Sequence, residues 1–275
     1  MKRLYIARVI LAVAFLVAAI LCFTTGYSQR SAILAGTRHL HIMPLYFAES
    51  AGVIAVWLVI TLVWGRIYCS TVCPVGTLQD IMLLIRRRIP ALNRPFRYRH
   101  PQPARWHVLV VYMICLVAGL AVLPLILEPW FITGNIVTLF GGRGMSQIWL
   151  SYGFSSLWGV ICGLVALLVL LPWALLRGRE FCNSVCPVGT VLGTVSRHAA
   201  FCIEIDGDRC ISCMRCQDNC RTGSIKVVSR YVDNGRCVRC MECVSRCPSS
   251  AIRYTQDRRR PATPLFSRSR QYNKT

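Results

Sequence analysis

The stretch GRIYCSTVCPVGT at residues 65–77 returns as GREFCNSVCPVGT at residues 178–190, displaced by 113 positions. Nine of fourteen positions match between 64–77 and 177–190. Each copy contains Cys-x3-Cys-Pro and comes after two apolar segments, so the unit is an internal repeat. Parallel repeats of this kind are commonly related by an axis along the membrane normal. Such an axis brings four cysteines toward one centre: Cys69, Cys73, Cys182 and Cys186.

The apolar segments of the repeat are long enough to cross a bilayer, which requires about 20 mostly apolar residues. Hydrophobic residues make up 55% of the 275-residue chain, and four stretches concentrate them, at roughly 4–24, 50–68, 106–127 and 157–176. The first is expected to be a retained anchor rather than a signal peptide, because three more spans follow it. We therefore expect a membrane α-helical domain with four transmembrane helices over residues 1–200.

Lys and Arg predict the orientation of these spans, because short cytoplasmic loops are enriched in both. The N-terminal arm and the loop between the second and third spans carry eleven, whereas the other two loops carry three. We expect a multi-pass protein of the bacterial inner membrane with both termini cytoplasmic. Most of the net charge of +21 then comes from residues that orient the spans in the membrane or face lipid. Residues 75–90 predict an interfacial helix whose arginines face anionic lipids, and nucleic acid is not an expected partner.

A second cysteine pattern lies further along the chain. CISCMRCQDNC at 210–220 and CVRCMECVSRCP at 237–248 both read C-x2-C-x2-C-x3-C. In two-cluster ferredoxins the fourth cysteine of each run ligates the other cluster. The runs predict one [4Fe–4S] cluster held by Cys210, Cys213, Cys216 and Cys247 and a second held by Cys220, Cys237, Cys240 and Cys243. Paired C-x2-C motifs also occur in zinc sites, but the doubled run favours clusters.

Residues 201–256 resemble a small α+β bacterial-type ferredoxin domain, with strands expected at 201–206, 224–229 and 252–255. The proline usual after the fourth cysteine is present as Pro248, but Arg221 replaces it in the first half. This departure is expected to alter packing around a cluster without removing a ligand. The basic tail over 257–275 is expected to be disordered.

The CxxxCP cysteines leave three interpretations open. A spacing of four places both sulfurs of a pair on one helix face, as two ligands of one metal require, so the four could bind a third metal centre, either iron–sulfur or copper. They could instead act as redox-active thiols, or form an architectural turn at the membrane surface. In each case the proline after the pair is expected to begin a new helix whose backbone amides point at the thiolates.

The remaining polar and sulfur-containing candidates lie in or near the spans. Four cysteines are expected to pack as small hydrophobic side chains: Cys22, Cys115, Cys162 and Cys202. His39 and His41 lie in an outer loop, where a histidine can take up the proton released by a quinol or simply anchor the chain. Residues 128–143 are expected to form a second outer loop, which is another candidate for a quinone site. Glu49 and Glu128 are expected to be solvated at the outer interface.

The two motifs Cys69–Pro74 and Cys182–Pro187, the four spans and the ferredoxin runs together resemble the NapH family, membrane iron–sulfur subunits of quinol dehydrogenases. The NosR and CcoG groups share this core. The resemblance implies electron transfer between the quinone pool, as substrate, and a partner redox protein or cytochrome subunit. The alternatives are a CcoG-like copper reductase or assembly factor acting through the four CxxxCP cysteines, and a redox-sensing regulator.

Overall fold

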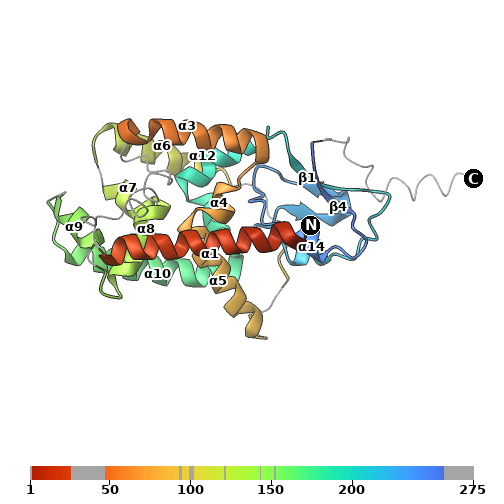
Figure 1. Cartoon of the computed structure of the whole chain (residues 1–275), viewed down its shortest axis with the longest axis horizontal. Helices are drawn as coiled ribbons and strands as arrows, with labels where there is room; N and C mark the ends of the chain where they lie inside the picture. Colours follow the sequence, from red (N-terminus) through yellow and green to blue (C-terminus); the bar gives the residue numbers. More distant parts are fainter. Residues whose placement is uncertain are drawn as a thin grey trace, which may run out of the picture.

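The structure, a computed structural model, has a helical body joined to a small domain with short strands (Figure 1). It describes residues 2–25, 47–92, 95–98, 102–120, 122–142, 144–151 and 153–256. The loop with His39 and His41 and the basic tail lie outside the described residues.

Four long helices frame the body: α1 (Lys2–Thr25), α3 (Phe47–Trp64), α6 (Ala104–Val117) and α10 (Leu157–Arg177). Two of them, α1 and α10, are long and apolar enough to cross a membrane, and α3 and α6 contain shorter apolar stretches. Only 28% of the apolar window in α1 and 22% of that in α10 is buried. Both helices therefore present apolar side chains outward, as lipid-facing helices do.

The expected third span over 106–127 is not one continuous helix. After α6 the chain turns, and α7 (Val122–Leu127) begins separately. Gly119 adopts a φ of 73°, and the amide of Leu120 donates to the carbonyl of Cys115 at 2.8 Å. This is the hydrogen-bonding pattern of a glycine-terminated helix, and it ends α6 before the predicted boundary.

The segment expected as an outer loop forms α8 (Pro129–Thr138), which lies inside the helical body with all ten residues buried. It packs mainly against α10 and α1, and α9 (Gly144–Ser151) follows it. The expectation that Glu128 is solvated is wrong, because its side chain is fully buried and accepts a hydrogen bond from the Tyr112 hydroxyl. The Trp-, Phe- and Ile-rich sequence of α8 favours burial between helices over exposure in a loop.

The long helices alternate in direction. The starts of α1 and α6 and the ends of α3 and α10 lie at the end of the body that meets the small domain (Figure 1). There the hydroxyl of Tyr254 donates to the carbonyl of Trp64 at 2.6 Å, and the amide of Arg179 donates to the carbonyl of Arg221 at 2.8 Å. Backbone as well as side chains therefore fix the small domain to the helices.

The small domain contains two antiparallel strand pairs and three short helical segments. Strand β1 (Cys202–Ile205) pairs with β4 (Ile252–Thr255), and β2 (Ile225–Lys226) pairs with β3 (Tyr231–Val232). The helical segments are η2 (Val227–Ser229), α13 (Arg215–Asp218) and α14 (Glu242–Arg246). The expected first and last strands are confirmed, whereas the strand expected at 224–229 is shorter and continues as η2.

Candidate metal centres

The two cysteine runs of the small domain are displaced by 27 residues and fold alike. Ser212 and Met214 in the first run and Arg239 and Met241 in the second all have left-handed backbones, with φ of 55°, 61°, 54° and 60°. This conformation costs a non-glycine residue roughly 1–2 kcal/mol. Alternating left-handed residues curl a loop so that successive amides face an anion. Both loops therefore have the shape of a cradle for an anionic group.

The first predicted ligand set lines a single small cavity. Its walls include Cys210, Cys213, Cys216 and Cys247, together with Ile205, Val227 and Ile252. Three of these cysteines come from the first run and one from the second, which is the crossing that the spacing predicted. Burial raises the pKa of Cys216 to about 12, and the neighbouring Cys210 and Cys247 add to this. Cys213 is exposed, so this set lies at the protein surface.

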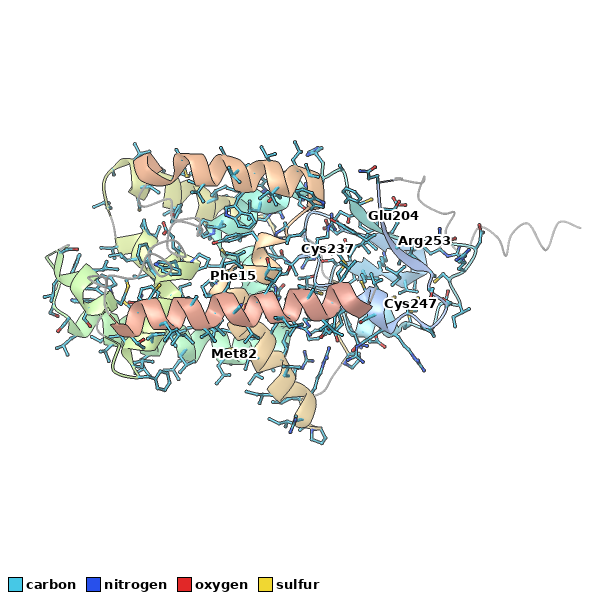
Figure 2. The ribbon with its side chains drawn as sticks, viewed as in Figure 1. Phe15, Met82, Glu204, Cys237, Cys247 and Arg253 are labelled. Atoms are coloured by element: carbon cyan, nitrogen blue, oxygen red, sulfur yellow. The ribbon has the colours of Figure 1, made fainter. Side chains whose placement is uncertain are left out.

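The second set lies closer to the helical body. Cys220 is near Cys237 and Cys240, and Cys243 interacts electrostatically with all three. Burial raises the pKa of Cys220 to about 11. Cys240 packs against the core of the helical body. Figure 2 labels Cys237 of this set and Cys247 of the first set, both in the small domain.

The fourth cysteine of each run receives the same hydrogen bond. The amide of Ser224 donates to Cys220 Sγ at 3.3 Å, and the amide of Ala251 donates to Cys247 Sγ at 3.3 Å. Burial alone would raise the pKa of Cys247, but hydrogen bonds from Ser249 and Ala251 outweigh it and lower that pKa. Donors aimed at sulfur favour the thiolate, which is the form that binds iron.

The CxxxCP motifs form two matching turns. Each consists of a short helix and a longer one: α4 (Tyr68–Thr71) with α5 (Pro74–Arg88), and α11 (Phe181–Ser184) with α12 (Pro187–Ser196). The prolines occupy the first helical position in both motifs, which confirms the predicted helix starts. The amide of Gly189 donates to Cys186 Sγ at 3.3 Å, so the predicted amide at sulfur is confirmed in the second motif.

The prediction that both sulfurs of a pair share one helix face is wrong. Cys69 belongs to α4, whereas Cys73 is the extended N-cap residue of α5, with φ −65° and ψ 116°. The reason is the proline that follows Cys73, because a residue before proline is biased to extended backbone. The pair is therefore arranged around a turn rather than along a helix.

All four CxxxCP cysteines meet in one buried core, where each is only 3–4% exposed. Burial raises the pKa of Cys182 to about 11, with Cys69 adding to the effect. Burial also raises the pKa values of Cys73 and Cys186, and Cys182 adds to both. Among the described residues, no three His, Cys, Asp or Glu side chains are placed to share a single metal ion. Thiols whose pKa values are raised in this way carry negative charge only with a compensating cation or metal.

A pair of buried arginines crosses between the two repeats. Arg66 and Arg179 occupy equivalent positions, 113 residues apart. Arg66 Nη2 donates to the carbonyl of Cys182 at 3.0 Å, and Arg179 Nη1 donates to the carbonyl of Cys69 at 2.9 Å. Each arginine thus holds the first cysteine of the other motif, so the two halves are interlocked.

Asp80 on α5 gathers three arginines. Its carboxylate pairs with Arg8 at 2.6 Å, Arg179 at 2.7 Å and Arg221 at 2.6 Å. Although burial opposes ionisation, these cations hold the pKa of Asp80 well below its usual value. Arg221 also pairs with Glu242, and it is the residue that replaces the usual ferredoxin proline. The ion pairs therefore connect the small domain to the helical body through the residue next to Cys220.

Sequence reasoning missed this network. The Gly-Arg dipeptide of the repeat and an acidic residue inside the apolar segment 75–90 were the available signals. Arg8 and Arg66 entered only the prediction of orientation, and Arg221 only the comparison with ferredoxins. Three lone cysteines pack as expected: Cys22 and Cys162 contact an apolar cluster, and Cys202 is buried. Cys115 on α6 is half-buried. The side chain of Glu49 lies outside the described residues.

Comparison with known families supports iron–sulfur binding at both regions. A family described as 4Fe-4S binding domain matches residues 49–91 and 158–202, the segments that carry the two CxxxCP motifs. A second family with the same description matches residues 230–253. No solved structure matches the chain.

Named relatives carry the resemblance further. Ferredoxin-type protein NapH of Escherichia coli is 28% identical over 171 residues, 62% of this chain and 52% of the relative. Methylamine utilization ferredoxin-type protein MauN of Paracoccus denitrificans is 26% identical over 178 residues, 64% of this chain and 56% of the relative. The expected resemblance to NapH is confirmed. These matches span about half the length of the two relatives, and together with the family matches they support an iron–sulfur electron-transfer role.

Proposed function

We propose that this NapH-like chain is a four-span membrane protein that carries electrons between the quinone pool and a partner redox protein, using three [4Fe–4S] clusters. The observation that carries the proposal is the meeting of both CxxxCP pairs in one buried core, with Cys240 of the ferredoxin-like domain packed against it. When bound, a [4Fe–4S] cluster accepts and releases one electron at a time.

The membrane assignment rests on the outward faces of the helices. Exposed apolar side chains occur along all four long helices, including Leu4, Val59, Ile114 and Leu168. A soluble protein rarely exposes so continuous an apolar surface. The alternating helix directions and the basic segments at the end that meets the small domain favour both termini on the cytoplasmic side.

Two ligand sets are assigned to the ferredoxin-like domain, residues 201–256. Cys210, Cys213, Cys216 and Cys247 would hold the outer cluster, and Cys220, Cys237, Cys240 and Cys243 the inner one. The left-handed cradles and the amide donors to the fourth cysteine of each run support this, because they suit anionic thiolates around a cluster.

The third set is Cys69, Cys73, Cys182 and Cys186. Four soft thiolates suit iron–sulfur or copper(I), and the 4Fe-4S family match over both motifs favours the cluster. The buried Arg66, whose Nη2 lies 3.8 Å from Cys69 Sγ, supports an anionic group at this position. The inner ferredoxin set lies between this core and the exposed Cys213, so the chain would offer three adjacent centres from membrane to surface.

The proposal is tested by mixing the purified protein with a quinol in the absence of oxygen while the absorbance of the clusters is followed. Quinol should bleach the clusters of the wild-type protein, and serine at Cys69, Cys73, Cys182 and Cys186 should abolish this bleaching. A variant with alanine at His39 and His41 tests whether the outer loop takes part. Reduction of copper(II) by the pre-reduced protein, dependent on the same four cysteines and without quinol oxidation, would support a copper reductase instead.

A further inference from the structure

The two crossing arginines of the repeat differ in one respect, which is their charge balance. Arg179 pairs with Asp80, a carboxylate that it shares with Arg8 and Arg221, so its charge is partly compensated. The repeat places Gly193 where a carboxylate equivalent to Asp80 would stand. A Cβ atom built at Gly193 would lie only 3.4 Å from Arg66 Nη1, so Arg66 occupies this space. Among the described residues, no carboxylate forms an ion pair with Arg66.

Arg66 is nevertheless deeply buried, with 1% of its surface exposed. Its donors reach Asn183 Oδ1 at 2.5 Å and the carbonyls of Cys182 and Gly235 at 3.0 and 3.1 Å, and no described residue accepts a hydrogen bond from its Nε. An unpaired buried cation is strongly unfavourable, because its desolvation is not repaid by an opposite charge. A group of the CxxxCP core that can carry negative charge lies beside it, because Arg66 Nη2 is 3.8 Å from Cys69 Sγ.

We propose that Arg66 is the charge-compensating residue of the CxxxCP centre and raises its reduction potential. This inference rests on the proposed third cluster. Reduction adds one negative charge to the four-thiolate centre, and a fixed cation at its edge stabilises the more negative state. Arg179 also lies beside this core, but the carboxylate of Asp80 offsets part of its charge. Arg66 acts through its positive charge and its contacts with Cys69 and Cys182, one from each motif. It is therefore a positioning residue that exchanges no electron.

The contact with Gly235 gives Arg66 a second consequence. Gly235 lies two residues before Cys237, a ligand proposed for the inner ferredoxin cluster, and Asn183 contacts both Arg66 and the carbonyl of Arg236. The same guanidinium therefore contacts the CxxxCP core and the loop leading to the neighbouring centre. It fixes these two ligand sets relative to each other and also changes the difference in reduction potential between the two centres.

The test is a potentiometric titration followed by electron paramagnetic resonance. The signal of the CxxxCP centre is the one absent from the variant with serine at its four cysteines. Arg66→Gln should lower its potential by at least the equivalent of a tenfold change in the reduction equilibrium, about 59 mV for one electron. Arg66→Lys, which keeps the charge, should retain most of the potential. Arg86→Gln is the control, since Arg86 is also buried, at 4% exposed, but donates to the carbonyl of Leu92.

Signals of the two ferredoxin clusters report on folding in each variant. A third signal whose potential is equal in wild type and Arg66→Gln would overturn the role of Arg66 while leaving the third centre intact. Loss of the third signal in Arg66→Gln but not in Arg66→Lys would support the role of Arg66, because lysine keeps the positive charge and glutamine removes it. Absence of any third signal from wild type would overturn the proposed centre and this inference together.

Discussion

At the scale of the residue, the decisive groups are buried charges that join segments distant in sequence. Asp80 is 8% exposed and binds arginines from α1, from the second CxxxCP turn and from the ferredoxin-like domain. A single carboxylate therefore connects three parts of the chain. Removing one partner of a buried ionic network leaves uncompensated charge, which costs more than the loss of a surface ion pair.

Replacing Asp80 with asparagine should lower the free energy of unfolding by about 3–5 kcal/mol, because three arginines lose their carboxylate. Urea titration of the purified protein in detergent, followed by cluster absorbance, measures this loss. Asp208→Asn is the matched control, since Asp208 is exposed, and its effect should stay within about 0.5 kcal/mol. Equal effects of the two substitutions would contradict the network.

Tyr112 donates to the fully buried Glu128. Tyr112→Phe should destabilise the protein by about 1–3 kcal/mol, because a buried acceptor loses a donor. Tyr231→Phe, at an exposed position, serves as the control in the same urea titration. If both variants unfold at the wild-type urea concentration, the Tyr112 hydrogen bond contributes nothing to stability.

At the scale of the element, the ends of α3 and α10 matter most, because the ferredoxin-like domain docks there. Gly178 ends α10 with a φ of 72°, and a Cβ atom at this position would lie 2.3 Å from the carbonyl oxygen of Arg221. The close approach lets the amide of Arg179 bond to that same carbonyl. A side chain at 178 must push away the backbone beside Cys220.

Gly178→Ala should therefore loosen the docked domain. Gly119→Ala is the control, because Gly119 has a similar φ of 73° but open space around its Cβ position. Both variants carry the backbone cost of roughly 1–2 kcal/mol, and only Gly178→Ala adds the clash. Limited proteolysis should release the ferredoxin-like domain faster from Gly178→Ala. Identical cleavage rates for both variants would contradict this docking contact.

The elements also show which predictions sequence can support. The doubled cysteine spacings and the prolines after them encode local geometry. The meeting of Cys210, Cys213, Cys216 and Cys247 around one cavity and the helix starts at Pro74 and Pro187 were therefore predictable. Burial of α8 and the break after α6 were not, because an apolar segment looks alike in lipid and inside a helical body. The partners of Asp80 depend on long-range packing, which no local pattern specifies.

At the scale of the whole molecule, Arg221 connects the ferredoxin-like domain to the helical body. Arg221→Pro restores the residue found after the fourth cysteine of the other run, so the clusters of the domain should assemble normally. It removes the ion pairs to Asp80 and Glu242, and the domain should then exchange amide hydrogens faster at its contact with the helices. Arg246→Ala removes an exposed partner of Glu242 and should change nothing there. Unchanged exchange in Arg221→Pro would contradict the connecting role.

At the scale of the whole chain, we propose three cysteine sets in sequence from the buried CxxxCP core to the exposed Cys213. The most important part of this proposal is that the CxxxCP core holds a cluster. The most direct measurement is iron and acid-labile sulfide per chain in protein purified without oxygen, compared with the variant carrying serine at Cys69, Cys73, Cys182 and Cys186. Three clusters predict about 12 iron per wild-type chain and about 8 in the variant. About 8 in both samples would contradict the third cluster.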